Sequence, residues 1–403
     1  MTVLFGHPGG NPNSHNAALA HFEAGRLEAF CVPWIPSEVA LGLLCCAAPL
    51  RPMAQRLARR RFSGLSAAPK VQGRIGEWRR LMLRAAGCND ERLSYEANDW
   101  LMSTMTREVR RSQVTAVHAY EDCSLNQFLE AKSLQKACIY DMPIGYYPAW
   151  EQTLAELLHR FADWLPERGP PSQRFVRPKQ KRREMELADL VMVPSSFVEQ
   201  TIRMFCPEKR IARAYYGVDS DFWTPPSESS GQRPLRFIYA GQLSLRKGIP
   251  DLIEAWRRAK LQDAELELVG MWLLAENKRR SLPTGVIHRE PLSAEKLRER
   301  YQNADVFVFP SYFEGFGLVL TEAMACGLPV IATTSTIGPD IIDDTCGRLV
   351  SVGDVDEMVE VLCWFSDHRE WLIAMSRYAR KRAEQLTWQC YREQVSAAVA
   401  PLV

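Results

Sequence analysis

From residue 235 onward, short apolar runs alternate with segments of helical periodicity. The apolar, strand-like runs are 235–241, 264–270, 305–311, 329–333 and 347–350, and the helical patterns are 249–260, 293–304, 318–327 and 354–365. Strands that alternate with helices in this way form a parallel sheet with helices packed on its faces. The sequence therefore predicts an α/β class with a doubly wound sheet in this half of the chain.

The first half shows the same alternation less regularly. Strand-like runs lie at 2–6, 114–120, 136–143 and 188–195, and a helix is predicted at 14–24, ended by Gly25. Residues 224–234 are rich in Pro, Ser and Gly, which is the composition of a linker. A length of 403 residues also favours more than one unit. We expect two domains, residues 1–230 and 231–385, joined near residue 230.

Composition and charge exclude several classes of protein. Lys and Arg number 50 against 48 Asp and Glu, so no strong overall field favours nucleic acid. Eleven cysteines without a Cys-x-x-Cys pair indicate a reduced, cytoplasmic compartment and no structural zinc. The most apolar run, 39–50, is shorter than the roughly 20 residues of a spanning helix, and no signal peptide pattern opens the sequence.

One strand-to-helix transition carries two glutamates. In open parallel sheets, ligands bind beyond the carboxyl ends of the strands, and two facing sheets form a cleft. Gly315, Phe316 and Gly317 lie where a helix begins, so their N–H groups favour a phosphate. Glu314 and Glu322 can accept hydrogen bonds from sugar hydroxyls. The pattern indicates a nucleotide sugar, or else two acids that only complement the helix dipole.

Two further stretches follow predicted strands. Arg246 and Lys247 come after the strand 235–241, where two cations suit a diphosphate whose leaving charge must be stabilised. The alternative is an ordinary solvated basic loop. Gly9 and Gly10 separate the first strand from the first helix, which allows close approach of phosphate or sugar, or simply a tight turn.

Taken together, these stretches resemble the retaining nucleotide-sugar glycosyltransferases of family four. The resemblance covers nearly all of 235–365 and extends to 186–202 and 215–223. It implies the GT-B fold, two doubly wound Rossmann-like domains facing across a cleft. By the same resemblance, residues 386–403 form a terminal helix that returns to the N-terminal domain.

The resemblance also implies roles for single residues. Glu314 would contact the transferred sugar, Glu322 the ribose, and Lys247 the diphosphate. The rest of the implied donor site is Gly9, Gly10, Gly241, Arg246, Gly315, Phe316, Gly317 and Leu318. The reaction would retain the configuration at the anomeric carbon and need no divalent metal and no cofactor beyond the nucleotide-diphosphate sugar.

The sequence departs from the family pattern at two positions. Gln242 stands where many relatives have arginine, and we expect Arg246 to take over its role. Asp141 stands where relatives often carry histidine, and we expect it to orient the acceptor or the sugar. The nearest histidine, His118, lies mid-strand and is expected to be a core residue or to lie behind the site. Other polar groups at strand ends are Glu121 and Asp122.

The acceptor is less defined: a glycan, a lipid-linked sugar or a small molecule. Residues 51–61 hold five arginines and no acid, and 174–183 hold six Lys or Arg. Since the first run follows the apolar stretch 39–50, it could lie on an anionic membrane, at its inner face, in surface-polysaccharide or glycolipid synthesis. Such runs are also common on plain solvated faces. A nucleotide-sugar epimerase and a noncatalytic GT-B binding subunit stay as alternative functions.

Overall fold

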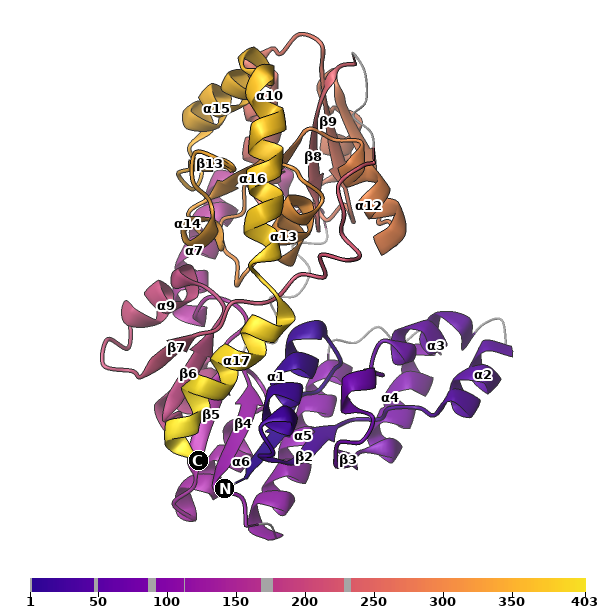
Figure 1. Ribbon diagram of the computed structural model, residues 1–403, viewed down its shortest axis with the longest axis vertical. Coiled ribbons are helices and arrows are strands. Elements are labelled where there is room, and N and C mark those ends of the chain that lie inside the picture. Colours follow the sequence, from indigo (N-terminus) through magenta and orange to yellow (C-terminus); the bar gives the residue numbers. More distant parts are fainter. Residues whose placement is uncertain (1, 47–49, 86–91, 112, 168–176, 228–232) are drawn as a thin grey trace.

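The chain folds into two α/β units that lie one above the other (Figure 1). The structure, a computed structural model, describes residues 2–46, 50–85, 92–111, 113–167, 177–227 and 233–403. Each unit has one sheet whose strand pairs are all parallel, so the predicted α/β class with doubly wound sheets is confirmed. The expected junction near residue 230 lies outside the described residues.

The first sheet has seven strands in the order β3-β2-β1-β4-β5-β6-β7, which is the Rossmann order extended by one strand. The strands are β1 Val3–Gly6, β2 Leu27–Val32, β3 Lys70–Gln72, β4 Ala116–Tyr120, β5 Ala137–Asp141, β6 Leu190–Val193 and β7 Ile211–Arg213. The helices are α1 Pro12–Glu23, α2 Glu38–Cys46, α3 Arg51–Ala58, α4 Arg74–Ala85, α5 Arg92–Arg111, α6 Leu125–Ser133, α7 Tyr147–Arg160, α8 Pro178–Leu187 and α9 Ser196–Arg203.

The second sheet has six strands in the order β10-β9-β8-β11-β12-β13. Its strands are β8 Leu235–Ala240, β9 Ala264–Val269, β10 Val286–Arg289, β11 Val306–Phe309, β12 Val330–Thr333 and β13 Gly347–Val350. The helices after residue 240 are α10 Ile249–Ala259, α11 Glu276–Arg280, α12 Ala294–Gln302, α13 Leu318–Ala325, α14 Gly338–Ile341, α15 Val355–Asp367, α16 Leu372–Glu384 and α17 Trp388–Val399.

The sequence prediction missed four strands and misplaced the start of one helix. The missed strands are β2, β3, β7 and β10; β3, β7 and β10 are the outermost strands of their sheets and are only half-buried, so they lack a continuous apolar run. Helix α1 begins at Pro12, two residues earlier than predicted, because Asn11 caps it: the Ser14 amide donates to Asn11 Oδ1 at 2.9 Å.

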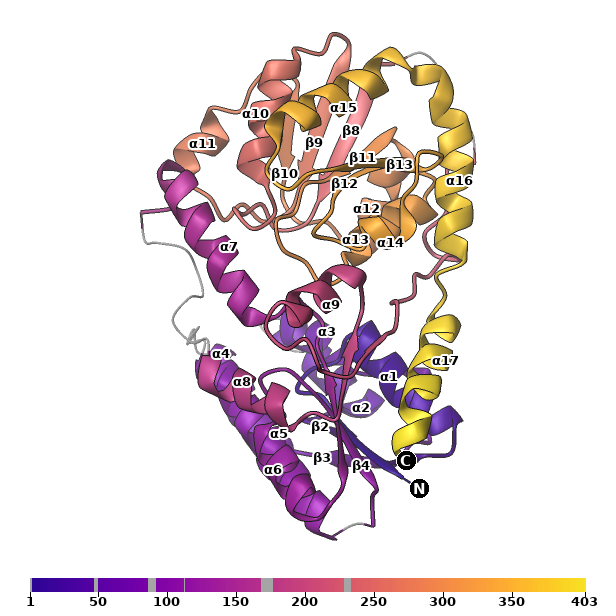
Figure 2. The same cartoon turned by 90° about the vertical axis from the view of Figure 1, so that its left-hand side faces the viewer.

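Two helices connect the domains in opposite directions. Helix α17 runs down from the second domain onto α1, where Arg392 Nε donates to Glu23 at 2.8 Å and Nη1 to Asn16 Oδ1 at 3.0 Å (Figure 1). Helix α7 rises from the first domain to the second, where Arg160 Nη2 lies 2.7 Å from Asp251 Oδ1 (Figure 2). The first domain thus contacts α17, which follows the second sheet in the chain, and the second domain contacts α7, which belongs to the first domain.

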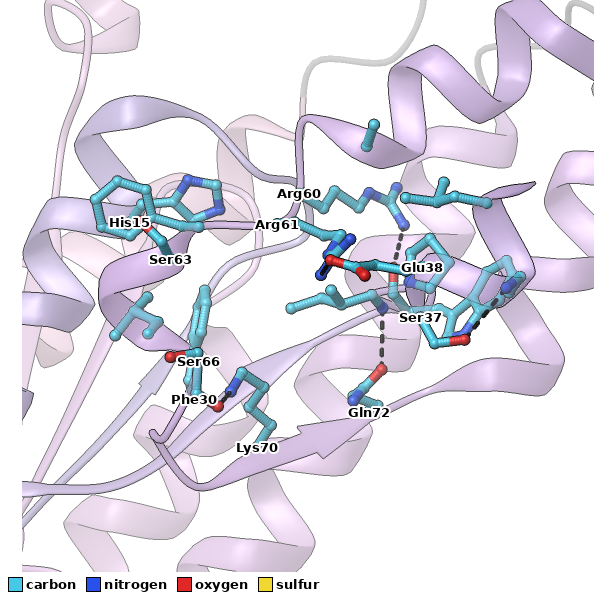
Figure 3. Close-up of a pocket in the computed structure, with 18 of the residues that line it drawn as sticks. His15, Phe30, Ser37, Glu38, Arg60, Arg61, Ser63, Ser66, Lys70 and Gln72 are labelled. Carbon is cyan, nitrogen blue, oxygen red and sulfur yellow. Dashed lines mark hydrogen bonds and ion pairs between the residues drawn. The ribbon is translucent and has the colours of Figure 1, made fainter. Parts of the chain in front are cut away.

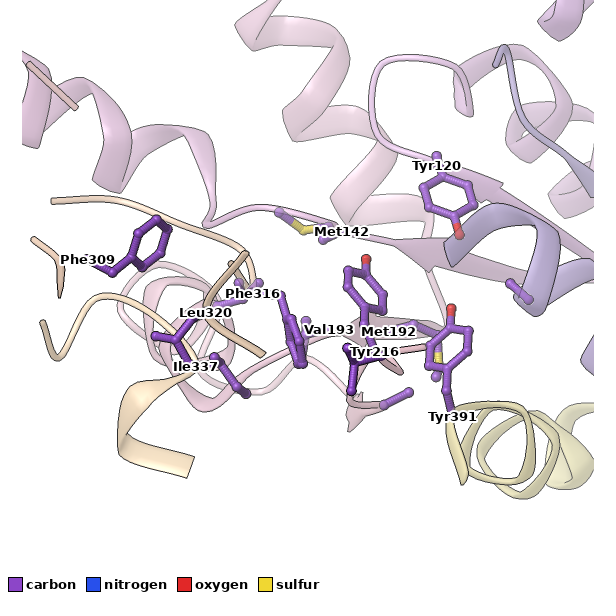
Figure 4. Packing of buried hydrophobic residues seen from close by; sticks show 14 of the residues in the cluster. Tyr120, Met142, Met192, Val193, Tyr216, Phe309, Phe316, Leu320, Ile337 and Tyr391 are labelled. Atoms are coloured by element: carbon purple, nitrogen blue, oxygen red, sulfur yellow. The ribbon is translucent and has the colours of Figure 1, made fainter. Parts of the chain in front are cut away.

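The hydrophobic core continues from one domain into the other. Figure 4 shows buried side chains from both domains in one row, with Phe316 beside Tyr216 and Tyr391 beyond. The ring centroids of Phe316 and Tyr216 are 5.2 Å apart, and those of Tyr216 and Tyr391 are 5.5 Å apart. Because the loop that carries Glu314 also carries Phe316, this packing fixes the loop between the two sheets.

Candidate active site

The candidate site lies at the switch point of the second sheet, between the parallel strands β8 and β11, where the order in which successive strands join the sheet reverses. Ligands of open α/β sheets bind at this position. The loop after β8 carries Arg246 and Lys247, and the loop after β11 carries Glu314. Gly248 lets the loops touch: its φ is +68° and a Cβ there would lie 1.9 Å from the carbonyl oxygen of Pro310.

Arg246, Lys247 and Glu314 form one charged cluster. Arg246 Nη1 lies 2.9 Å from Glu314 Oε1 and 2.6 Å from the carbonyl oxygen of Phe313, and Lys247 Nζ donates to the same Oε1. Lys247 and Glu314 are both buried. Burial lowers the pKa of Lys247, and the charge of Glu314 partly offsets that effect. Two cations share one carboxylate, so an anionic ligand can replace Glu314 on either cation.

Glu322 lies on α13, the helix that begins just after the Glu314 loop. Burial raises the pKa of its carboxyl group to about 7. Within the described ranges, no hydrogen bond or ion pair to its side chain is present. A half-buried carboxylate in this state is stabilised by any ligand that brings hydroxyl donors to it.

The glycines of the Glu314 loop pack closely against other parts of the protein, where a larger side chain would not fit. A Cβ on Gly315 would lie 1.6 Å from the carbonyl oxygen of Pro143 in the first domain, and Ser195 Oγ donates to the Gly315 carbonyl at 2.5 Å. Gly317 has a φ of +91° and caps α13. The structure thus brings the loop after β5 against the loop after β11, and Phe316 is a buried packing residue.

Asp141 ends β5 on the other side of this contact. Its neighbour on β4 is Tyr120, and only 3% of Asp141 is exposed. Burial raises the pKa of Asp141 to about 7, although the nearby Tyr120 hydroxyl opposes the shift. The residue lies at the expected strand end but among buried side chains, so a ligand reaches it only if these side chains move.

Behind Asp141 lies a pair of histidines. His118 is fully buried, as predicted, with its Nε2 3.5 Å from Asp141 Oδ2 and its Nδ1 2.9 Å from His21 Nε2. Burial lowers the pKa of both rings, so both are neutral near pH 7. The sequence analysis did not single out His21 or Tyr120. Tyr120 was findable only from the strand register, which pairs Tyr120 with Asp141.

Glu121 and Asp122 do not point to a ligand site. They pair with Lys181 of α8 at 3.0 and 3.3 Å. Burial raises the pKa of Glu121 to about 7, and Lys181 opposes the shift. Lys181 belongs to the second basic run, of which residues 174–176 lie outside the described residues. The described part of that run therefore includes a lysine, Lys181, that forms ion pairs inside the protein and does not face solvent as part of a basic surface.

Other expected donor-site residues have local roles. The amide of Gly9 donates to His7 Nδ1 at 3.0 Å, and a Cβ on Gly10 would meet the Arg60 Cα at 2.9 Å. Gly241 has a φ of +145° and its amide donates to the Val269 carbonyl. Gln242 is exposed, whereas Arg246 reaches the cluster. Leu318 is the first residue of α13.

The first basic run lies on a small helical arm made of α2, α3 and α4. Val39 and Leu43 of α2 are 74% and 70% exposed, while Leu44 packs into a separate small core. Residues 47–49 of the apolar stretch lie outside the described residues. Within the residues that are described, no helix is both long and apolar enough to span a bilayer, and no three His, Cys, Asp or Glu side chains gather as metal ligands.

Comparison with known proteins shows that the second domain is similar to glycosyltransferases. Residues 224–382 match the family model "Glycosyl transferases group 1". The D-inositol 3-phosphate glycosyltransferase of Paenarthrobacter aurescens is 32% identical over 219 residues, 48% of this chain and 54% of that protein. The O-antigen chain mannosyltransferase B of Escherichia coli is 26% identical over 286 residues, 65% of this chain and 74% of that protein. The chain spans about half the length of the first of these relatives.

Solved structures resemble the whole chain. Sucrose-phosphate synthase from Thermosynechococcus elongatus has a TM-score of 0.66 at 18% identity, covering 100% of this chain and 99% of that one. Anabaena Alr3699/HepE in complex with UDP-glucose has a TM-score of 0.62 at 15% identity, with 100% of both chains covered. These likenesses confirm the predicted GT-B fold. The chain has this fold throughout, and its residues 224–382 are similar to the glycosyl transferases group 1.

Proposed function

We propose that the protein is a retaining glycosyltransferase that moves a sugar from a nucleotide-diphosphate sugar to a glycan, a lipid-linked sugar or a small-molecule acceptor. The observation that carries the proposal is the cluster of Arg246 and Lys247 on one oxygen of Glu314, at the switch point of the second sheet. Relatives are glycosyltransferases, and a neighbour of the same fold binds UDP-glucose, which supports a nucleotide-sugar donor.

Donor binding would begin with an exchange of partners. The diphosphate takes the place of Glu314 on Lys247 and Arg246, because phosphate oxygens carry more charge than one carboxylate. The two cations then stabilise the charge that develops as the diphosphate leaves, which is the work that a divalent metal does elsewhere. Glu314, released from both cations, accepts hydrogen bonds from hydroxyls of the transferred sugar.

Glu322 would hold the ribose. Its side chain has no partner within the described residues, and two vicinal hydroxyls can donate to its two oxygens. The amides of Gly315, Phe316 and Gly317 directly precede α13 and would lie against the donor sugar and phosphate, with Leu318, Gly241, Gly9 and Gly10 around it. Phosphate near this helix end is further favoured by the helix dipole.

The acceptor would enter from the first domain. Asp141 would orient the acceptor or the sugar once donor binding has loosened the buried contacts around it. The exposed apolar side chains of α2 and the first basic run would rest on the anionic inner face of the membrane, where lipid-linked acceptors of surface polysaccharide or glycolipid synthesis are found. The protein would then be cytoplasmic and peripheral to the membrane.

The first experiment is calorimetry with UDP, GDP, ADP and their sugars on the wild type and on Glu322→Ala. We expect one nucleotide to bind, and the variant to bind it about 10- to 100-fold more weakly, because it loses hydrogen bonds to a charged acceptor. Arg246→Ala tests the replacement of the missing arginine at Gln242. Unchanged donor affinity and turnover in Arg246→Ala would sink that role, and no binding by the wild type would favour a noncatalytic subunit.

Three further measurements address the finer claims. The anomeric proton coupling of the product, read by NMR, should match that of the donor if the configuration is retained, and free epimerised sugar without acceptor product would instead indicate an epimerase. Turnover should survive EDTA. Liposome co-sedimentation should depend on anionic lipid and on salt, and insensitivity to both counts against the membrane contact.

A further inference from the structure

A cavity of about 890 Å³ opens in the first domain, between β2, β3 and the helical arm (Figure 3). We call it the arm pocket, and its functional side chains are Arg60, Arg61, Lys70, Phe30, Trp34 and Trp78. It is distinct from the cluster around Glu314, which lies in the second domain. Its volume is in the range of sites that hold a small organic ligand.

Aromatic rings form one wall of the arm pocket. The ring centroids of Trp34 and Trp78 are 4.8 Å apart, and Trp78 is 40% exposed. Phe62 stacks on His15 at 5.2 Å, with ring planes 10° apart. Burial lowers the pKa of His15 to about 4, so the ring is neutral near pH 7. Large flat rings with polar tips pack well against the C–H faces of sugars.

Cations form the other wall. Lys70 Nζ donates to the carbonyl oxygens of Ser66 and Ala68 at 3.0 and 2.9 Å. Figure 3 shows Lys70 beside Ser66. An ammonium group has three N–H donors, so one is left for a ligand, and no carboxylate pairs with Lys70 in the part of the chain that is described. Arg61 pairs at 2.8 Å with Glu38, and both side chains are exposed, so this weak pair exchanges readily for a ligand anion.

Arg60 braces the pocket from behind. Its Nη1 donates to the Trp34 carbonyl at 3.1 Å and its Nη2 lies 2.7 Å from Glu77. Arg80 also pairs with Glu77, so the carboxylate is shared by two guanidinium groups. The charge that faces the cavity is therefore positive: three cations and the single carboxylate of Glu38 line it.

The arm pocket lies on the same sheet edge as Asp141. Trp34 follows the carboxyl end of β2, Asp141 ends β5, and β1 and β4 lie between them. Three strand spacings give a separation of about 14 Å. The loop after β1 borders the pocket, since a Cβ on Gly10 would lie 3.0 Å from His15 Nε2.

We propose that the arm pocket binds an acidic sugar unit of the acceptor, with its carboxylate or phosphate at Lys70 and Arg61 and its ring against Trp34 and Trp78. This assignment rests on the proposed glycosyl transfer. The reacting hydroxyl near Asp141 would lie about 14 Å from the acidic unit, a span of two or three sugar residues. The acidic sugar is either part of a free glycan or the head group of a lipid.

The test measures binding by ligand-observed NMR and by vesicle co-sedimentation. The soluble probes are a glucuronate-containing hyaluronan tetrasaccharide and neutral maltotetraose. The vesicles are phosphatidylcholine with either phosphatidylinositol or phosphatidylserine. The variants are Lys70→Met and Arg61→Gln, with Arg59→Gln as the matched control, because Arg59 belongs to the same basic run, is exposed and does not line the cavity.

We expect the wild type to bind the acidic tetrasaccharide about tenfold more tightly than neutral maltotetraose, or to bind phosphatidylinositol vesicles about tenfold more tightly than phosphatidylserine vesicles. Lys70→Met and Arg61→Gln should each remove most of this preference, and Arg59→Gln should leave it within about twofold. Binding of the tetrasaccharide indicates a free glycan, and preference for phosphatidylinositol alone indicates a lipid head group.

The assignment is overturned if acidic and neutral probes bind alike, if neither binds, if both kinds of anionic vesicle bind equally without the tetrasaccharide, or if the variants keep the preference. Nucleotide affinity of the same variants separates the two proposals. If acidic probes bind and no nucleotide does, the transferase proposal is contradicted and the arm-pocket proposal stands. If a nucleotide binds and no acidic probe does, only the arm-pocket proposal is contradicted.

Discussion

The two domains have the same strand order around their switch points, but the charged side chains at their strand ends have different kinds of partner. In the second domain, Arg246, Lys247 and Glu314 come from two loops and meet at the sheet edge, where a ligand can exchange with them. In the first domain, Asp141 and Glu121 turn inward, to Tyr120 and Lys181. The same topology thus carries a charged cluster shared by two loops in one domain, and carboxyl groups held by interior partners in the other.

The largest expected effect concerns the second domain. Lys247→Ala should lower turnover by about 10²- to 10³-fold if Lys247 has its proposed role, because the variant lacks the positive charge proposed to stabilise the leaving diphosphate. Arg246 still pairs with Glu314 in this variant, so the fold should persist, which circular dichroism checks. Lys381→Ala, an exposed lysine on α16, is the control and should retain full turnover. Equal turnover in both variants would contradict the role of Lys247.

The matching substitution in the first domain should affect stability instead. Lys181→Met leaves Glu121 and Asp122 without their buried cation and should lower the free energy of unfolding by about 3 kcal/mol. Urea unfolding measures the change, with Lys179→Met on the same helix as a control that should shift it by less than about 0.5 kcal/mol. Donor affinity should not change. A variant that unfolds normally but fails to bind the donor would reverse the comparison.

The difference between the domains also explains why the charged cluster of the second domain could be predicted from the sequence, whereas the burial of Asp141 in the first domain could not. Glu314, Lys247 and Glu322 lie in short loops and a helix directly after strands with strong apolar runs, so strand order alone brings Arg246, Lys247 and Glu314 to one switch point. Asp141 was located at its strand end by the same logic. Its burial was not predictable, because it depends on Tyr216 and on Tyr391, which is about 250 residues away along the chain and arrives with α17.

The arm pocket illustrates the same limit. The basic run 51–61 is evident in the sequence, but Lys70 and Trp78 join it only because β3 and α4 fold back beside β2. Strand β3 has only three residues, too few to show a strand pattern, so its place in the sheet is fixed by tertiary pairing.

A third prediction uses the raised pKa of Asp141. Its folded pKa, about 7, is above the ordinary value of 3.8, so the native state binds more protons than the unfolded state between these values. Stability from this residue is therefore lost as pH rises from about 4 to 7. Asp141→Asn should match the wild type near pH 4 and be about 4 kcal/mol more stable near pH 8, as thermal unfolding would show. An equal difference at both pH values would contradict the burial of an ionisable Asp141.

The smallest expected effect distinguishes the buried carboxyl of Asp141 from the half-buried carboxyl of Glu322. Burial also raises the pKa of Glu322 to about 7, and we propose that this side chain binds the ribose. Ribose hydroxyls donate to the ionised form, so binding lowers the pKa and releases a proton, and nucleotide affinity should rise about tenfold from pH 5.5 to 8. In Glu322→Gln the affinity should be flat with pH. In Asp141→Asn it should keep the wild-type slope, because that carboxyl is shielded from the nucleotide. A slope that follows Asp141 instead would place nucleotide recognition in the first domain.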